Sequence, residues 1–80
     1  MTTNDAVAKR ILKLLKEKEM TLYRFEQKSG VYHGVMDRIL KGKNKTIELD
    51  TLFKLAHGFE MSVIEFLDDE LFRFEDLDIE

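Results

Sequence analysis

Residues 21–45 read TLYRFEQKSGVYHGVMDRILKGKNK, a pattern that predicts two short helices separated by a glycine turn. Thr21 offers a side-chain hydroxyl as the N-cap of a helix at roughly residues 22–29. Gly30 ends that helix, because glycine readily adopts the left-handed backbone conformation that closes helices. Val31 follows as an apolar anchor, so the pattern predicts a tight turn directly before the next helix.

The second helix of the pair is expected at roughly residues 33–41, where apolar side chains recur at helical spacing. The inward-facing positions are Val31, Met36, Ile39 and Leu40. Gly42 stops this helix, and the segment KGKNK at residues 41–45 predicts a strongly basic loop after it.

Three further helices are predicted around this pair, because apolar residues recur at intervals of three and four positions. They span roughly residues 5–18, 50–58 and 63–68. The last has the clearest start, since Ser62 and Glu65 fit a capping box. No strand pattern of convincing length precedes residue 68, so the fold class is all-α, with one five-helix domain over residues 1–67.

Composition limits the classes of function. The chain of 80 residues contains no cysteine, which excludes disulfides and thiolate metal sites. His33 and His57 do not have the spacing of a zinc site, and no catalytic constellation is present, so neither a metal, a cofactor nor enzyme activity is expected. The chain also lacks an apolar secretion segment and any run long enough to cross a membrane, and a cytoplasmic protein is therefore expected.

Charge is segregated along the chain. Residues 1–58 carry twelve Lys or Arg and seven Asp or Glu, a net charge of +5, whereas residues 59–80 carry one Arg and nine acids, a net charge of −8. This asymmetry favours a polyanion-binding face with an acidic end elsewhere. The alternative is a solvated acidic tail without a partner.

The helix pair, together with LDTLFKLAHGFEMSVIEFL at residues 49–67, resembles the phage repressor and Cro-like helix-turn-helix regulators, the XRE family. The resemblance covers about residues 6–67 and rests on spaced apolar and glycine positions. These are Phe25, Gly30, Val31, Met36, Ile39, Gly42, Leu52, Ala56 and Leu67. The resemblance implies a compact five-helix, lambda-repressor-like DNA-binding domain that serves as a sequence-specific transcriptional regulator, of the repressor type, and binds double-stranded DNA as a homodimer.

The same resemblance assigns the DNA contacts by position. The helix at about 33–41 enters the major groove, and the base-facing residues would be His33, Gly34 and Arg38. Arg38 is the strongest of these, because its guanidinium can donate two hydrogen bonds to guanine, although an ion pair with Asp37 or another neighbouring acid is the alternative. Phosphate contacts would come from Thr21, Tyr32, Lys41, Lys43, Asn44 and Lys45.

Three positions depart from the family pattern. Glu26 stands where the family packs a small residue, so its carboxylate is expected to reach the rim or a cation such as Lys28 or Arg38. Tyr32 replaces the usual Ser or Thr cap and leaves the second helix of the pair without a good side-chain cap. Gly58 and Glu60 reverse the usual arrangement at the end of the fourth helix, where glycine normally follows the last apolar residue.

Residues 68–80 form an acidic apolar C-terminal extension whose pattern fits a helix and a strand equally well. We expect its apolar side chains to form a dimer interface, because a purely solvating tail does not need them. They are Leu71, Phe72, Phe74, Leu77 and Ile79. The alternative is that Leu71 and Phe74 pack back on the first helix. The alternative function is a protein-interaction module of the antitoxin or anti-repressor type, in which this extension binds a protein partner and DNA binding is weak or lost.

Overall fold

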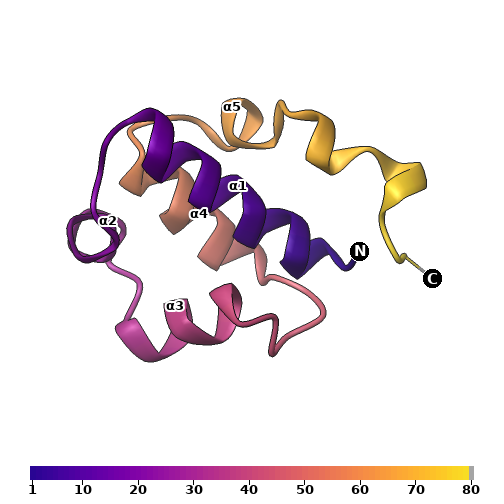
Figure 1. The fold of residues 1–80 in the computed structure, drawn as a ribbon, viewed down its shortest axis with the longest axis horizontal. Helices are drawn as coiled ribbons and strands as arrows, with labels where there is room; N and C mark the ends of the chain where they lie inside the picture. Colours follow the sequence, from indigo (N-terminus) through magenta and orange to yellow (C-terminus); the bar gives the residue numbers. More distant parts are fainter. Residues whose placement is uncertain (80) are drawn as a thin grey trace.

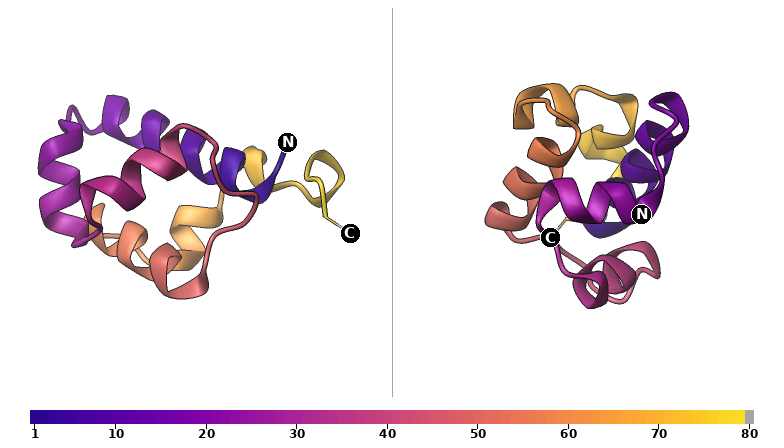
Figure 2. Two further views of the ribbon diagram at one scale, coloured as in Figure 1. Left: turned by 90° about the horizontal axis from the view of Figure 1, so that it is seen from below. Right: turned by 90° about the vertical axis from the view of Figure 1, so that its left-hand side faces the viewer.

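The computed structural model describes residues 1–79 and shows five α-helices followed by two short 3₁₀ turns (Figure 1, Figure 2). The α-helices are α1 (Thr3–Glu17), α2 (Leu22–Ser29), α3 (His33–Leu40), α4 (Leu49–Gly58) and α5 (Val63–Leu67), and the turns are η1 (Glu70–Phe72) and η2 (Phe74–Asp76). Residues 1–79 contain no strand, and the predicted all-α fold is confirmed. Each predicted helix is present, with its ends within two residues of the expected positions.

Helix α1 begins earlier than predicted because Thr2 and Asp5 form a capping box. The Thr2 side chain accepts a hydrogen bond from the Asp5 backbone N–H at 3.0 Å, and the Asp5 carboxylate accepts one from the Thr2 N–H at 3.2 Å. Two backbone donors at the helix start are thereby satisfied. The first turn of α1 is therefore held in place, and the loop after α3 lies against it.

The core lies where the inner faces of the five α-helices meet. A row of aromatic rings runs through it, with centroids 4.0 Å apart for Phe25 and Phe59 and 6.4 Å apart for Phe59 and Phe66. Phe72 continues the row at 6.2 Å from Phe66. Such ring pairs contribute about 0.5–1.5 kcal/mol each beyond the burial of their surface. The row links α2, the end of α4, α5 and η1.

Gly58 allows α2 and α4 to pack closely. A Cβ atom at this position would lie 2.7 Å from Ser29 Cβ and 2.8 Å from Phe25 Cε1, so the helices could not keep their present separation. Because this glycine is used for packing, the left-handed position after α4 falls to Glu60, with φ of 57°. Lys28 holds the Glu60 carboxylate at 3.0 Å and lowers its pKa through that hydrogen bond. The unusual order of Gly58 and Glu60 thus has a steric reason.

The C-terminal extension is neither an α-helix nor a strand, because long-range contacts set its path. Phe72 packs against the core, and the Met1 ammonium group donates to the Asp76 carbonyl at 3.1 Å. The Asp78 N–H in turn donates to the Met1 carbonyl at 2.8 Å, so the extension runs back to the N-terminus (Figure 1). Phe72 therefore packs within its own subunit, as the alternative interpretation of the extension expects for Leu71 and Phe74.

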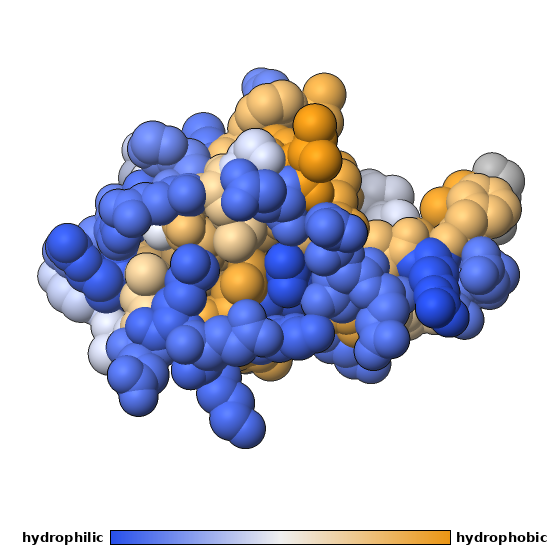
Figure 3. Space-filling model, turned by 90° about the horizontal axis from the view of Figure 1, so that it is seen from above, coloured by the Kyte–Doolittle hydropathy of each residue, from blue (hydrophilic) through white to orange (hydrophobic). Residues whose placement is uncertain are grey.

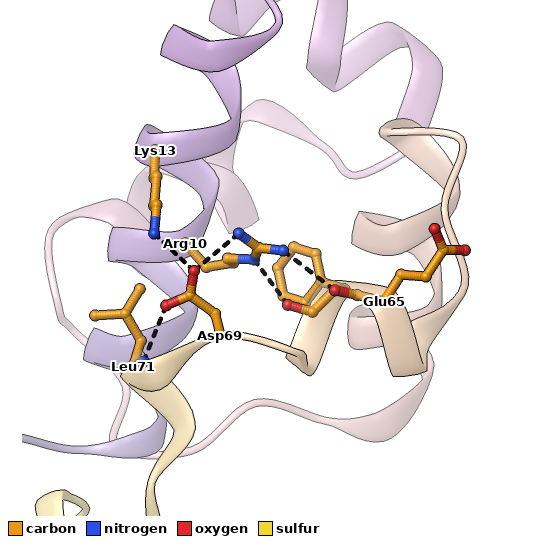
Figure 4. A network of polar contacts seen from close by, with 6 residues as sticks. Arg10, Lys13, Glu65, Asp69 and Leu71 are labelled. Atoms are coloured by element: carbon orange, nitrogen blue, oxygen red, sulfur yellow. Dashed lines mark hydrogen bonds and ion pairs between the residues drawn. The ribbon is translucent and has the colours of Figure 1, made fainter.

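Arg10 fastens the start of this extension to α1 (Figure 4). Its guanidinium donates to the Phe66 carbonyl at 2.8 Å, to the Glu65 carbonyl at 3.1 Å and to the Asp69 carboxylate at 3.0 Å. These carbonyls lie at the C-terminal end of α5, where backbone acceptors lack partners within the helix. Arg10 is thus a buried cap for α5 as well as an ion-pair partner.

Asp69 receives three donors and is held as a carboxylate (Figure 4). Lys13 Nζ lies 2.8 Å from its Oδ2, and the Leu71 N–H donates to its Oδ1 at 3.0 Å. The hydrogen bond from Lys13 is the largest cause that lowers the pKa of Asp69, followed by the bond from the Leu71 backbone. The same contact raises the pKa of Lys13.

Candidate nucleic-acid interface

The α2–α3 pair has the turn that the sequence predicts. The Thr21 side chain accepts from the Arg24 N–H at 3.1 Å, and Gly30 has a left-handed φ of 73°. Val31 is buried directly after the turn, while α3 lies on the side of the molecule opposite α5 (Figure 1, Figure 2). The pair therefore presents the outer face of α3 to solvent.

The predicted base-facing residues lie on that outer face. His33 is the first residue of α3 and its side chain is 77% exposed. Gly34 has no heavy atom within 4 Å of the position where a Cβ would stand, so the backbone of the first turn is open to an approaching duplex. Arg38 is exposed near the end of the same helix. All three are accessible from one side, as a helix that reads base edges requires.

Glu26 contacts His33, and neither Lys28 nor Arg38 is its partner. Its Oε2 lies 2.9 Å from His33 Nδ1, and its side chain is only 13% exposed. The carboxylate thus meets a side chain at the rim of the helix pair, but the two cations named as examples are not its partners, because Lys28 pairs with Glu60 and Arg38 lies further along α3. If Nδ1 donates to the carboxylate, the other ring nitrogen of His33 stays available to a base or phosphate.

Arg38 is held by an amide and not by a carboxylate. One guanidinium nitrogen donates to Asn44 Oδ1 at 3.1 Å, whereas Asp37 pairs with Lys41 at 3.1 Å. The alternative of an Arg38–Asp37 ion pair is therefore wrong. A guanidinium has five N–H donors, so this single bond orients Arg38 and leaves donors for a guanine edge.

The predicted phosphate contacts surround the ends of α2 and α3. Thr21 and Tyr32 precede the two helices, and Tyr32 is 82% exposed and makes no side-chain cap, as the sequence predicts. The remaining positions, Lys41, Lys43, Asn44 and Lys45, lie in the loop after α3. The Lys43 N–H donates to the Arg38 carbonyl at 2.9 Å, which folds this basic loop back on α3.

Two features of this surface gave no signal in the sequence. The side chain of Thr3 in α1 donates to the Lys45 carbonyl at the end of the basic loop, and the side chain of Asn4 donates to the Ile39 carbonyl in the last turn of α3. Asp78 and Ile79 of the extension also line one surface pocket together with Lys45. The acidic end of the chain thus lies near the basic loop, whereas the charge segregation in the sequence favours a position away from the polyanion-binding face.

A metal site and a membrane span each place requirements on the described residues. Residues 1–79 contain no group of three or more His, Asp or Glu side chains placed to hold a metal ion. Within the same residues, none of the helices has the length and apolar character needed to cross a lipid bilayer.

The fold and this surface define a helix-turn-helix DNA-binding domain: two short helices meet at a glycine turn, and the second is exposed beside a basic loop. The sequence model of the Cro/C1-type HTH DNA-binding domain family matches residues 10–71, and the chain belongs to that family. The resemblance to phage repressor and Cro-like regulators is thereby confirmed. No curated protein and no solved structure matches the chain. The match runs past residue 67 into η1, and a domain end at residue 67 stays a prediction.

Proposed function

We propose that this protein is a sequence-specific transcriptional regulator that reads the DNA major groove with α3 and acts in the cytoplasm as a repressor. The main support for this proposal is the outer face of α3, where Arg38, oriented by its hydrogen bond to Asn44, lies beside the exposed lysines of the basic loop. Arg38 supplies direct base readout, and His33 and the open backbone at Gly34 complete the base-facing surface. The lysines neutralise phosphates and fix the register of the helix on the duplex.

We also propose that the protein binds as a homodimer, since a two-fold operator needs two recognition helices about 34 Å apart. Exposed apolar side chains of the extension support this proposal, with Phe74 70% and Ile79 48% exposed. Figure 3 shows apolar surface on the extension, at the right-hand end of the molecule. Leu71, Phe72 and Leu77 are partly buried within the subunit and would contribute only their outer edges.

The salt dependence of DNA binding tests the phosphate-binding surface. Binding to a duplex of about 20 base pairs is measured by fluorescence anisotropy between roughly 50 and 200 mM salt. Lys43→Ala should weaken binding to all sequences alike and reduce the slope of log affinity against log salt by about 1, because one phosphate contact is lost.

Lys9→Ala is the matched control, since Lys9 is an exposed residue of α1 that belongs neither to the proposed DNA-binding surface nor to the proposed dimer interface. It should leave the slope unchanged. Equal slopes for wild type, Lys43→Ala and Lys9→Ala would count against the basic loop as the DNA contact.

A protein-interaction module is the second candidate function. The exposed Phe74 and Ile79 on an acidic segment favour it, because such a surface suits an apolar and basic partner. The two functions differ in the residues on which they depend. Substitutions at Arg38 and Lys43 weaken DNA binding or relax its sequence preference in a DNA-binding regulator, whereas they leave partner binding through the extension intact.

A further inference from the structure

The first turn of α1 is hydrogen-bonded to the last turn of α3 and to the far end of the basic loop. Asn4 is fully buried, and its Nδ2 donates to the Ile39 carbonyl at 3.0 Å. Its backbone N–H donates to the Lys45 carbonyl at 3.2 Å, and Thr3 Oγ1 donates to the same carbonyl at 3.1 Å. Thr3 and Asn4 thus connect the last turn of α3 to the end of the basic loop at Lys45.

Folding stability alone gives a poor reason for an asparagine at this position. Asn4 Oδ1 is buried and has no hydrogen-bond partner among the residues that the structure describes. A buried polar atom without a partner costs free energy, and an apolar side chain would avoid that cost. The benefit of the amide lies in its donor group, which fixes where α3 ends and where the loop begins.

The loop is also confined on its other sides. The Gly42 N–H donates to the Ile39 carbonyl at 3.1 Å, the same acceptor that Asn4 uses. A Cβ atom at Gly42 would lie 3.2 Å from Asp5 Oδ1, so the first turn of α1 sits directly against the loop. The capping box of Thr2 and Asp5 holds this turn in place. The turn that supports the loop is therefore itself held by two hydrogen bonds.

We propose that Asn4, with Thr3, is a positioning residue for DNA binding: it holds the loop that carries Lys43 and Lys45 in a fixed place relative to α3. This inference rests on the proposed function. A loop ordered before binding loses less conformational entropy when its lysines meet phosphates, so affinity rises without any contact between Asn4 and DNA. Release of the loop should weaken DNA binding about three- to tenfold.

The test compares Asn4→Ala and Thr3→Val with wild type and with Ile11→Val. The Thr3→Val substitution removes one hydroxyl from a half-buried side chain and keeps its shape, so it remains informative if Asn4→Ala folds poorly. The Ile11→Val control removes one buried methylene group further along α1, where the side chain belongs to the core. All measurements are made at a temperature at which circular dichroism shows each variant to be folded.

Two readouts separate positioning from general destabilisation. The first is amide hydrogen exchange at Gly42 and Lys43, which should become faster in Asn4→Ala and unchanged in Ile11→Val. The second is binding to a mixed-sequence duplex of about 20 base pairs, for which Asn4→Ala should show the lower affinity with a nearly unchanged salt slope, because the same lysines still meet phosphates in the complex. Thr3→Val should show the same changes to a smaller extent.

The outcomes distinguish this inference from the proposed function. If wild type binds the duplex and Lys43→Ala weakens it, but Asn4→Ala and Thr3→Val bind like Ile11→Val, the positioning role is overturned while DNA binding stands. Faster exchange in the loop with unchanged affinity overturns it as well. A wild-type protein that does not bind the duplex overturns both proposals together.

Discussion

Two glycines in helices should respond to alanine in opposite directions, because one is enclosed and the other is open. In Gly58→Ala the new Cβ would lie 2.7 Å from Ser29 Cβ, 2.8 Å from Phe25 Cε1 and 3.0 Å from Ser29 Cα. Carbon atoms pack at about 3.5–4.0 Å, so α2 and α4 must move apart by about 1 Å. Overpacking of this kind costs about 1–3 kcal/mol.

The helix propensity of alanine offsets part of that cost. Alanine in a helix interior is favoured over glycine by about 1 kcal/mol, and the gain is smaller at the last residue of α4. We expect Gly58→Ala to lower the free energy of unfolding by about 1–2 kcal/mol, which corresponds to a fall of roughly 5–15 °C in Tm for a domain of this size. Because α2 leads directly into α3, the same displacement should also weaken DNA binding.

Gly34→Ala is the matched substitution, because no heavy atom lies within 4 Å of its Cβ position. It should raise the free energy of unfolding by about 0.5–1 kcal/mol. Thermal and urea unfolding followed by circular dichroism measure both variants. If Gly58→Ala were as stable as wild type or more stable, the close packing of α2 on α4 would be refuted.

The remaining predictions concern the cap of α3, an acid-sensitive ion pair and the extension. Tyr32→Ser should supply the missing side-chain cap and raise stability by about 1 kcal/mol in urea unfolding, and an unchanged midpoint would contradict this view of the turn. Ionised Asp69 stabilises the folded state, because the pKa of Asp69 is lower in the folded state than in the unfolded state. This stabilisation is complete above the unfolded-state pKa of roughly 3.9, and it is lost as the pH falls through the lower folded-state pKa. Asp69→Asn should therefore be less stable than wild type at pH 7, with a difference that shrinks as the pH falls from about 4 to 2, whereas a constant difference would argue against the pair. Phe74→Ser combined with Ile79→Ser should convert the proposed dimer to a folded monomer in sedimentation experiments, and a dimer that persists would exclude the extension as its interface.

The helix-turn-helix pair could be predicted because its signals are local. The cap at Thr21 acts on a backbone group three residues away, and Gly30 needs only its own left-handed conformation. The early start of α1 was also encoded locally, since Thr2 and Asp5 have the spacing of a capping box with aspartate at its last position. Such features depend on neighbours within one helical turn, and the sequence displays them directly.

The path of the extension and the partners of the charged residues depend on distant parts of the chain. Arg10 and Asp69 are separated by 59 positions, and no periodic pattern in either segment predicts their contact. Glu26 meets His33 only because the turn folds α3 across α2. Asn4 reads as an ordinary residue in the first turn of a helix, although its amide reaches the end of α3. These contacts appear only when the helices are assembled.

Selection from a pool of random duplexes tests the claim that α3 reads bases through Arg38. Wild type and Arg38→Ala are selected in parallel under the same salt conditions, and the enriched sequences are compared. We predict one two-fold motif for wild type and the same motif with relaxed preference at one base position in each half-site for Arg38→Ala, since a bidentate contact to guanine supplies about 1–3 kcal/mol of discrimination. An unenriched pool for wild type, or an identical motif for both proteins, would contradict the claim.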